Sequence, residues 1–301
     1  MSDSSSSLVP PTLDAVASAR WLQRAQASWL NEEVGQRMQA RLQWIRHTPA
    51  QWLDWWPLNG GLQTHALVRA RYPDAHVQWV ERTEALTQTA RQALRGSWWQ
   101  RLRGRDAAQA RDAAAGSVEM LWANMALHWA AEPMALLRQW QQWLAPEGFV
   151  MFSCLGPDTL RELNAVYAEA SWPPCGHAYT DMHDWGDMLV QAGFAEPVMD
   201  MERIRLTYPD SQALWTDLRA MGRNLHRQRF AGLRGRAWHA QWHDRVQQLV
   251  QPDEQGRLVL TVEVIYGHAL KGAPRAAVSS TSEVSLQDMR AMLKTPPPLR
   301  K

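Results

Sequence analysis

Residues 52–81 constrain the fold of this chain most, because they have the pattern of one strand-turn-helix-strand unit. The pattern predicts a short apolar strand, a turn, a helix and a second strand, at 52–55, 58–61, 62–71 and 76–80. Gly60 and Gly61 lie in the turn, and Glu81 follows the second strand. In α/β proteins this arrangement brings a helix N-terminus and an acid to the sheet edge where nucleosides bind. The unit therefore predicts an α/β fold with a nucleoside site.

Four residues of this unit are candidates for binding the nucleoside cofactor. Gly60 and Gly61 lack a Cβ atom, so the backbone of the turn can approach a ligand closely. Glu81 stands where an acid accepts hydrogen bonds from both hydroxyls of a ribose. Asp54, at the end of the first strand, either accepts hydrogen bonds from a ligand ammonium or orders the turn. The alternative interpretation is a packed pair of strands with incidental acids.

Strands and helices alternate along the rest of the chain, which predicts a doubly wound sheet. Helical periodicity over 13–45 predicts two helices that separate near Leu30, with Asn31 as the N-cap of the second. The most strand-like run, 258–266, comes last and follows two helices, which favours an antiparallel final strand. The other predicted elements are helices at 83–94, 132–143, 158–168, 184–192, 211–221 and 235–250, and strands at 117–122, 149–154 and 197–206.

Two loops hold further candidates. Asn124, His128 and Trp129 follow a predicted strand, and open α/β sheets bind their ligands at the carboxyl ends of strands. We expect Asn124 to contact the cofactor, and His128 and Trp129 to contact the substrate. Asp106, in preference to Asp112, is placed to accept a hydrogen bond from an adenine amino group. For His128 and for both aspartates the alternative is a solvent-exposed side chain.

Charge and composition exclude several classes of function. A net charge of +2 gives no electrostatic reason to expect a nucleic acid or an anionic membrane as partner. No apolar run approaches the roughly 20 residues that span a bilayer. Cys154 and Cys175 are too few for a disulfide framework and fit a cytoplasmic location. The acids and histidines at 177–184 lack the spacing of a metal site, and Asp184 is a natural N-cap.

Three strings carry a resemblance to a known family. They are FSCLGPDTLRELN at 152–164, the segment 177–210 that begins HAYTDMHDWGD, and LTVEVIYGHALK at 260–271. With these strings, the chain closely resembles the malonyl-acyl-carrier-protein O-methyltransferases of biotin synthesis (the BioC family), from about residue 20 to residue 271. SVEMLWANMALHW, at 117–129, also resembles the fourth-strand segment of this family.

The resemblance implies a Rossmann-like, seven-stranded class I methyltransferase sheet with an antiparallel last strand and helical lid insertions. It implies S-adenosyl-L-methionine as cofactor, bound over the first two strands, and malonyl-acyl carrier protein or malonyl-CoA as substrate. We expect a cytoplasmic monomer that binds neither nucleic acid nor membrane. Our candidates for holding the substrate carboxylate are arginines, because arginine binds carboxylates with two parallel hydrogen bonds. Arg203 and Arg205 come first, and the alternatives are Arg161, Arg223, Arg227 and Arg229.

The expected organisation is a disordered segment at 1–12, a single domain at 13–271 and a flexible tail at 272–301. Within the domain we expect N-terminal helices, a nucleotide-binding core, two sets of lid and substrate helices, and a last strand, at 13–48, 50–155, 157–192 with 209–250, and 258–270.

The chain departs from the family at its first motif. The family reads Leu-Asp-x-Gly-x-Gly-x-Gly there, whereas Trp56 and Leu58 replace the first two glycines in this chain. Two alternatives to an active methyltransferase follow. One is a methyltransferase-like protein with impaired cofactor binding that acts as a binding or accessory module. The other, which the string GPDTLREL disfavours, is the related family of assembly factors that hydroxylate a protein arginine.

Overall fold

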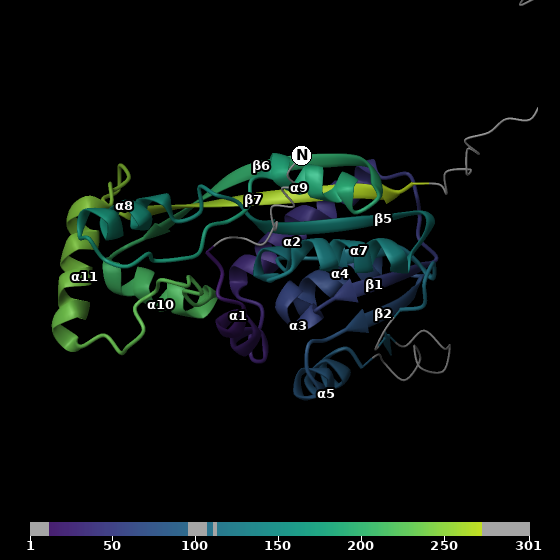
Figure 1. Ribbon diagram of the computed structural model, residues 1–301, viewed down its shortest axis with the longest axis horizontal. Helices are drawn as coiled ribbons and strands as arrows, with labels where there is room; N and C mark the ends of the chain where they lie inside the picture. The colour runs from purple at the N-terminus through teal and green to yellow at the C-terminus, as the bar shows by residue number, and fades with distance from the viewer. Residues whose placement is uncertain (1–11, 96–106, 111–112, 273–301) are drawn as a thin grey trace, which may run out of the picture.

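The computed structural model describes residues 12–95, 107–110 and 113–272. Within these residues seven strands form one sheet, in the order β3-β2-β1-β4-β5-β7-β6 (Figure 1). β7 lies between β5 and β6 and runs antiparallel to both, whereas the other pairs of neighbouring strands are parallel. This topology confirms the predicted fold class and its antiparallel last strand. The strands are β1 (Gln51–Trp55), β2 (His76–Val80), β3 (Ala108–Gln109), β4 (Val118–Ala123), β5 (Leu144–Leu155), β6 (Phe194–Tyr208) and β7 (Leu258–Lys271).

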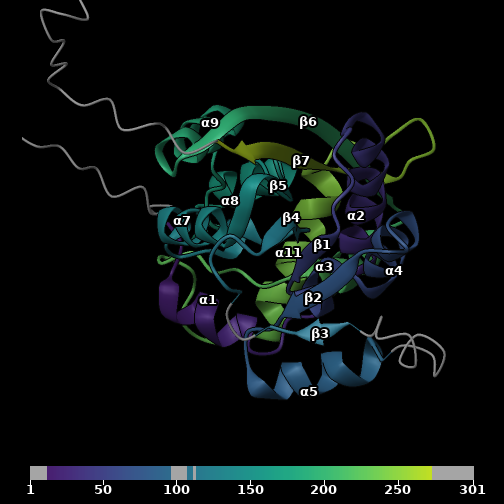
Figure 2. The same cartoon turned by 90° about the vertical axis from the view of Figure 1, so that its right-hand side faces the viewer.

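Helices cover both faces of the sheet (Figure 2). α2 and α4 pack on one face, around Trp52 and Trp122, and α7 and α9 pack on the other, around Trp140 and Trp185. All four tryptophans are at most 1% exposed, so each contributes on the order of 2–3 kcal/mol through burial. The helices are α1 (Ala15–Leu22), α2 (Trp29–Arg41), α3 (Pro57–Gly60), α4 (Leu62–Arg71), α5 (Glu84–Ala93), α7 (Pro133–Trp143), α8 (Arg161–Glu169), α9 (Met182–Gln191), α10 (Ser211–Met221) and α11 (Arg236–Leu249), with 3₁₀ turns η1 (Leu42–Trp44) and η2 (Leu127–Trp129).

The long strands β6 and β7 build a second region beyond the sheet. They extend past the other strands on the left of Figure 1, where α8, α10 and α11 lie. α8 contacts β7, α10 contacts β6, and α11 contacts both α8 and α10. These three helices therefore stand beyond the carboxyl ends of β4 and β5, and their role as lid helices stays a prediction.

Three helix starts differ from the sequence prediction: α8 begins at Arg161 rather than at Asp158, and the N-caps of α2 and α9 were misplaced. α2 begins after Ser28, and Asn31 lies inside its first turn, where its side chain accepts a hydrogen bond from the Ser28 N–H at 3.1 Å. α9 begins after Asp181, whose carboxylate accepts from the His183 N–H, so Asp184 lies in the first turn. In α2 and α9 a second capping residue, three positions earlier, occupies the N-cap.

Some predictions lie outside the described residues. They concern the termini at 1–11 and 273–301, together with Asp106 and Asp112. Within the described residues, no helix is long and apolar enough to cross a membrane.

Candidate active site

The turn after β1 has the backbone conformation of a glycine turn, although Trp56 and Leu58 stand where the family motif has glycines. Trp56 has a φ of 63°, in the left-handed region, and Gly61 has a φ of 112°. Between Trp56 and Gly61, α3 makes a single turn of helix, whereas the sequence predicts a non-helical turn at 58–61. Pro57 begins this turn, where a missing N–H group costs nothing. The Leu58 side chain packs in an apolar cluster with Trp79 and with Leu86 of α5, so it fills the space beside the turn.

Glu81 lies at the end of β2, as predicted, but its carboxylate is bound by the chain itself. Oε1 accepts a hydrogen bond from the Leu58 N–H at 2.9 Å, and Oε2 lies 3.5 Å from the Arg82 Nε atom. The side chains of Glu81 and Arg82 are 0% and 5% exposed. Burial raises the pKa of Glu81, and the Arg82 charge opposes only part of this rise. The acid predicted to bind a ribose therefore already has partners.

Asp54 forms a buried pair with a histidine of α4. Its Oδ2 atom lies 2.7 Å from Nδ1 of His65, and the two side chains are 2% and 4% exposed. Burial raises the pKa of Asp54, while the contact with His65 opposes the rise. The pair joins the end of β1 to the helix that follows the turn. Of the two roles predicted for Asp54, this geometry supports the ordering of the turn.

The N-terminus of α4 is capped by a glutamate from α2. The Glu32 carboxylate accepts hydrogen bonds from the N–H groups of Gln63 and Thr64 at 3.0 and 2.9 Å. A Cβ atom on Gly61 would lie 2.4 Å from Glu32 Oε2, so this close approach requires a glycine. Helix N-termini favour anions, and here a side chain of the protein supplies the anion.

Asn124 ties three segments together at the end of β4. Its Nδ2 atom donates to the carbonyls of Asn31 and Gly60, at 2.7 and 2.5 Å. The Ser153 hydroxyl of β5 donates to its Oδ1 atom at 2.7 Å. Asn59 donates to the Met125 carbonyl at 2.9 Å. Asn124 and Gly60, both predicted to bind cofactor, are thus in direct contact and are satisfied by backbone and side-chain partners.

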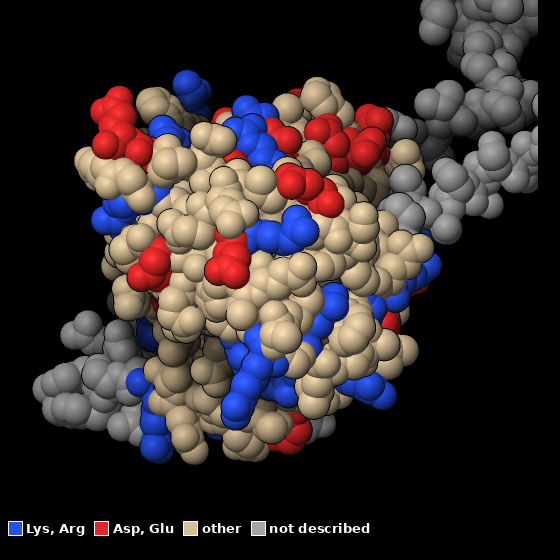
Figure 3. All heavy atoms as spheres, turned by 90° about the vertical axis from the view of Figure 1, so that its left-hand side faces the viewer, with Lys and Arg blue, Asp and Glu red and all other residues tan. Residues whose placement is uncertain are grey.

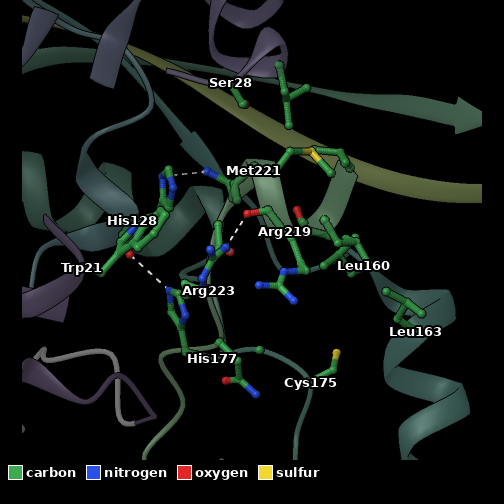
Figure 4. A pocket seen from close by; sticks show the side chains of 18 of the residues that line it. Trp21, Ser28, His128, Leu160, Leu163, Cys175, His177, Arg219, Met221 and Arg223 are labelled. Carbon is green, nitrogen blue, oxygen red and sulfur yellow. Dashed lines mark hydrogen bonds between the residues drawn. The ribbon is translucent and has the colours of Figure 1, made fainter. Parts of the chain in front are cut away.

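A cavity of about 520 Å³ opens between the carboxyl ends of the strands and the helices beyond them. The face that carries α10 and α11 is hollowed in its lower half, and basic side chains lie beside the hollow (Figure 3). Residues from distant parts of the sequence meet in the cavity (Figure 4). The lining includes Ser28 and Asn31 of the N-terminal helices, Asn59 of the turn, His128 and Trp129 of η2, and residues of α8, α10 and α11.

His128 and His177 form the polar side of the cavity (Figure 4). The His177 Nε2 atom lies 3.3 Å from the His128 carbonyl oxygen, and the Leu155 N–H donates to His128 Nδ1 at 3.4 Å. Burial lowers the pKa of His128 well below its ordinary value, and it lowers the pKa of His177 to about 4. Both rings are therefore neutral near pH 7 and offer hydrogen bonds rather than charge.

Three arginines line the cavity, Arg219, Arg223 and Arg234, and none of them has an acidic partner among the described residues. Arg219, in the last turn of α10, and Arg223, just after it, point into the space between His177 and Leu160 (Figure 4). Arg223 donates to the carbonyls of Arg219 and Gly222, whereas no hydrogen bond of the Arg219 guanidinium is present in the described part of the chain. Burial, followed by the charges of Arg219 and Arg24, lowers the pKa of Arg223.

The predicted site residues fall into three groups. His128 and Trp129 line the cavity. Asp54, Gly60, Gly61, Glu81 and Asn124 gather around the turn, but none of them lines the cavity. Arg203 and Arg205 lie on β6 away from it: Arg203 pairs with Asp158 at 2.8 Å, and Arg205 borders a separate hollow near Asp253. No group of acids, histidines or cysteines within the described residues could hold a metal ion.

Sequence reasoning missed Arg82, Glu32 and Arg219. Arg82 directly follows Glu81, the acid predicted to bind a ribose, and this adjacency is the one sequence feature that indicated a contact between them. Arg219 stands four residues after Trp215, and both line the cavity from one face of α10. Glu32 gave no sequence signal of its contact with α4, because the two helices are joined only by tertiary packing.

Comparison with known proteins decides the family. A family model described as a methyltransferase domain matches residues 59–152. The malonyl-[acyl-carrier protein] O-methyltransferase of Gallionella capsiferriformans is 40% identical over 272 residues, which cover 84% of this chain and 89% of that protein. The protein of the same name from Laribacter hongkongensis is also 40% identical, covering 83% and 85%.

The chain belongs to the malonyl-[acyl-carrier protein] O-methyltransferase family. The resemblance drawn from the sequence is confirmed, and with it the assignment to the methyltransferases. The fold agrees with a more distant protein, YcgJ of Bacillus subtilis. Its crystal structure aligns with a TM-score of 0.52 at 11% identity and covers 80% of this chain and 99% of that one.

The cofactor of this family can be tested against the residues of the turn. A ribose at Glu81 would meet a carboxylate that already accepts from Leu58 and pairs with Arg82. The N-terminus of α4, which suits the carboxylate of S-adenosyl-L-methionine, already holds Glu32. With Arg82 against Glu81 and with Glu32 at the N-terminus of α4, the nucleoside end of the site does not fit the cofactor. The cavity beyond this end is open.

Proposed function

We propose that this protein is an S-adenosyl-L-methionine-dependent O-methyltransferase that methylates the free carboxylate of malonyl-[acyl-carrier protein], in biotin synthesis. The observation that carries this proposal is the 40% identity with the Gallionella capsiferriformans protein of that name, over 84% of the chain. S-adenosyl-L-methionine is the methyl donor of this family. The cavity beyond the carboxyl ends of the strands supports the proposal, since it provides room for a second substrate.

The lining of the cavity suits an acyl chain that ends in a carboxylate. Leu160, Leu163 and Trp215 supply apolar walls, and Arg219 supplies a cation without an acidic partner in the described residues. An arginine binds a carboxylate through two parallel hydrogen bonds and so fixes its orientation. We therefore transfer the proposed carboxylate-binding role from Arg203 and Arg205, which lie outside the cavity, to Arg219.

The residues of the cavity favour a reaction without acid or base catalysis. A malonyl carboxylate is ionised near pH 7 and is already a nucleophile. His128 and His177 are neutral and buried, so they add hydrogen-bonding groups without competing charge. The apolar walls exclude water and hold the acyl chain, and orientation of this kind accounts for a large share of the rate in such transfers. The protein contribution we propose is binding, orientation and exclusion of water.

The partners and location of the protein are part of this proposal. The name of the relatives gives malonyl-[acyl-carrier protein] as the methyl acceptor, and we propose malonyl-CoA as a second thioester acceptor. We propose that the protein is a monomer in the cytoplasm, without nucleic-acid partners. The free cysteines Cys154 and Cys175 support a reducing compartment.

The test is methyl transfer in vitro. Purified protein is incubated with S-adenosyl-L-methionine and malonyl-acyl carrier protein, and mass spectrometry detects the methyl ester. Succinyl-acyl carrier protein, which is longer by one CH₂ group, serves as a control for recognition of chain length. Formation of the malonyl ester supports the proposal, and its absence at millimolar cofactor contradicts it.

The second candidate is a methyltransferase-like protein with impaired cofactor binding that acts as a binding or accessory module. The closed nucleoside end favours it, because Arg82, Leu58 and Glu32 occupy groups that would contact the cofactor. The two candidates differ in one measurable property. The accessory module binds the malonyl thioester in the cavity but does not consume S-adenosyl-L-methionine.

A further inference from the structure

The contacts around Arg82 come from three separate segments. Its guanidinium pairs with Glu81 and lies over the Trp56 ring, 5.1 Å from the ring centroid. Its Nη2 atom donates to the Ala25 carbonyl at 2.7 Å. Ala25 belongs to the connection between α1 and α2, which has a second contact with the turn through the Ala27 N–H and the Leu58 carbonyl at 2.6 Å. Arg82 therefore fastens the N-terminal connection over the turn.

Arg82 lies where the ribose of a bound nucleotide would lie in this fold. The acid at the end of the second strand binds the hydroxyls of a ribose in nucleotide-binding sheets. Here the backbone N–H groups of Leu58 and Arg82 donate to the Glu81 carboxylate, at 2.9 and 3.4 Å. The Arg82 guanidinium lies 3.5 Å from Oε2, in the space that ribose hydroxyls would otherwise occupy. A ribose and Arg82 cannot both contact Glu81, because its side chain is already 0% exposed.

The closed arrangement is incompletely bonded. Nε and Nη1 of Arg82 are buried and have no hydrogen-bond partner within the described residues. The guanidinium has five N–H donors, and unpaired buried donors are costly. A buried ion pair whose donors are not all hydrogen-bonded stabilises the fold little, compared with the same two groups separated and hydrated. The contact therefore has the properties of a latch that opens, rather than of a permanent core pair.

We propose that Arg82 is an intramolecular latch that occupies the ribose position at Glu81 and must leave before S-adenosyl-L-methionine binds. This inference rests on the proposed function for the identity of the ligand. When the latch opens, Arg82 swings out from Glu81 and the connection at 23–28 lifts from the turn. The observed affinity for the cofactor is then the intrinsic affinity reduced by the fraction of molecules that are open.

Binding of S-adenosyl-L-homocysteine by isothermal titration calorimetry tests the latch without depending on activity. Arg82→Ala removes the latch, and Trp56→Gly removes the ring beneath it while restoring the glycine of the family motif. Arg138→Ala, on the exposed side of α7, makes the same change of charge elsewhere. Circular dichroism establishes which variants are folded. We expect the two latch variants to bind at least about tenfold more tightly than wild type, and Arg138→Ala to match wild type.

Hydrogen exchange on the wild-type protein provides a test that needs no variant. The Ala27 amide is bonded to the Leu58 carbonyl in the closed arrangement, so saturation with S-adenosyl-L-homocysteine should speed its exchange. Unchanged protection of Ala27 in the bound protein overturns the latch. Equal or weaker binding by any folded latch variant also overturns it, and leaves the proposed function standing if wild type binds and methylates. Failure of every protein to bind overturns both the latch and the cofactor of the proposed function.

Discussion

Arg82 and Glu81 are consecutive residues whose side chains turn toward each other, with Nε of the arginine 3.5 Å from Oε2 of the glutamate and almost no exposure for either. Adjacent residues rarely form a buried pair, because successive side chains of a strand point to opposite faces. The pair forms here because β2 ends at Val80 and the chain leaves the sheet. Its consequences are measurable in stability as well as in binding.

Glu81→Gln leaves the Arg82 charge buried without its counterion. Loss of one partner of a buried pair that cannot separate costs roughly 3–5 kcal/mol. Because Arg82 can leave the latch for solvent, we expect a smaller decrease in the free energy of unfolding, of roughly 1–3 kcal/mol. Urea titration followed by circular dichroism measures it. Glu169→Gln, an exposed change at the end of α8, serves as control and should stay within about 0.5 kcal/mol of wild type. Equal stability of the two variants would show that the pair is not buried in solution.

Asp54→Ala should destabilise the protein by about 3 kcal/mol or more, because it leaves His65 buried without its acceptor. Asp54→Asn should cost less, since the amide oxygen of asparagine can accept from His65 at the same place. Thermal unfolding of both variants checks this order. If alanine and asparagine cost the same, the contact with His65 is not what makes Asp54 important.

Replacement of His177 should make the free energy of unfolding depend less on pH below about pH 6.5. The folded protein holds the pKa of His177 at about 4, whereas an unfolded chain has its ordinary value near 6.5. Between these values the unfolded state binds more protons, so stability is present above about pH 6.5 and is lost as pH falls toward 4. For His177 alone the loss between pH 7.5 and 5 is about 2 kcal/mol.

His177→Gln should lose less stability than wild type over that interval, by about the same 2 kcal/mol. Urea unfolding at the two pH values measures the difference, and subtraction of the two proteins cancels the contributions of other groups. His183→Gln, at an exposed histidine of α9, is the matched control. Parallel profiles for wild type and His177→Gln would contradict the burial of an uncharged ring.

Arg219→Gln should raise KM for malonyl-acyl carrier protein by about ten- to a hundredfold, the cost of a charge-assisted hydrogen bond to a carboxylate. Arg223→Gln should have a smaller effect, because Arg223 already donates to two backbone carbonyls. Arg219→Lys should recover part of the loss. Steady-state methyl transfer measures all three, and a larger effect at Arg223 would reverse the assignment.

The architecture was predictable because its signals are local. The helix predicted at 62–71 matches α4 residue for residue, and the strand predicted at 76–80 matches β2, since apolar spacing and the stop at Tyr72 and Pro73 agree there. The N-terminus of α2 was misplaced because Ser28 and Asn31 are both good caps, and sequence alone does not rank them. The turn at 58–61 became mostly helical because Pro57 is well suited to the first helical position.

The site was predictable only at the level of strand ends. Glu81 and Asn124 lie at the sheet edge that their positions imply. Their partners depend on rotamers and on tertiary contacts that no local pattern encodes, such as the reach of Arg82 to Ala25. Arg219 enters the cavity because the long strands β6 and β7 carry α10 beyond the carboxyl ends of β4 and β5.

The left-handed backbone at Trp56 carries a cost that a single substitution removes. A φ of 63° suits glycine, and it costs a residue with a Cβ atom roughly 1–2 kcal/mol. Glycine at this position relieves the strain without any change of the main chain. Tryptophan and glycine codons differ by a single base. One base change in the gene therefore places a glycine on a backbone that already has the conformation that glycine favours.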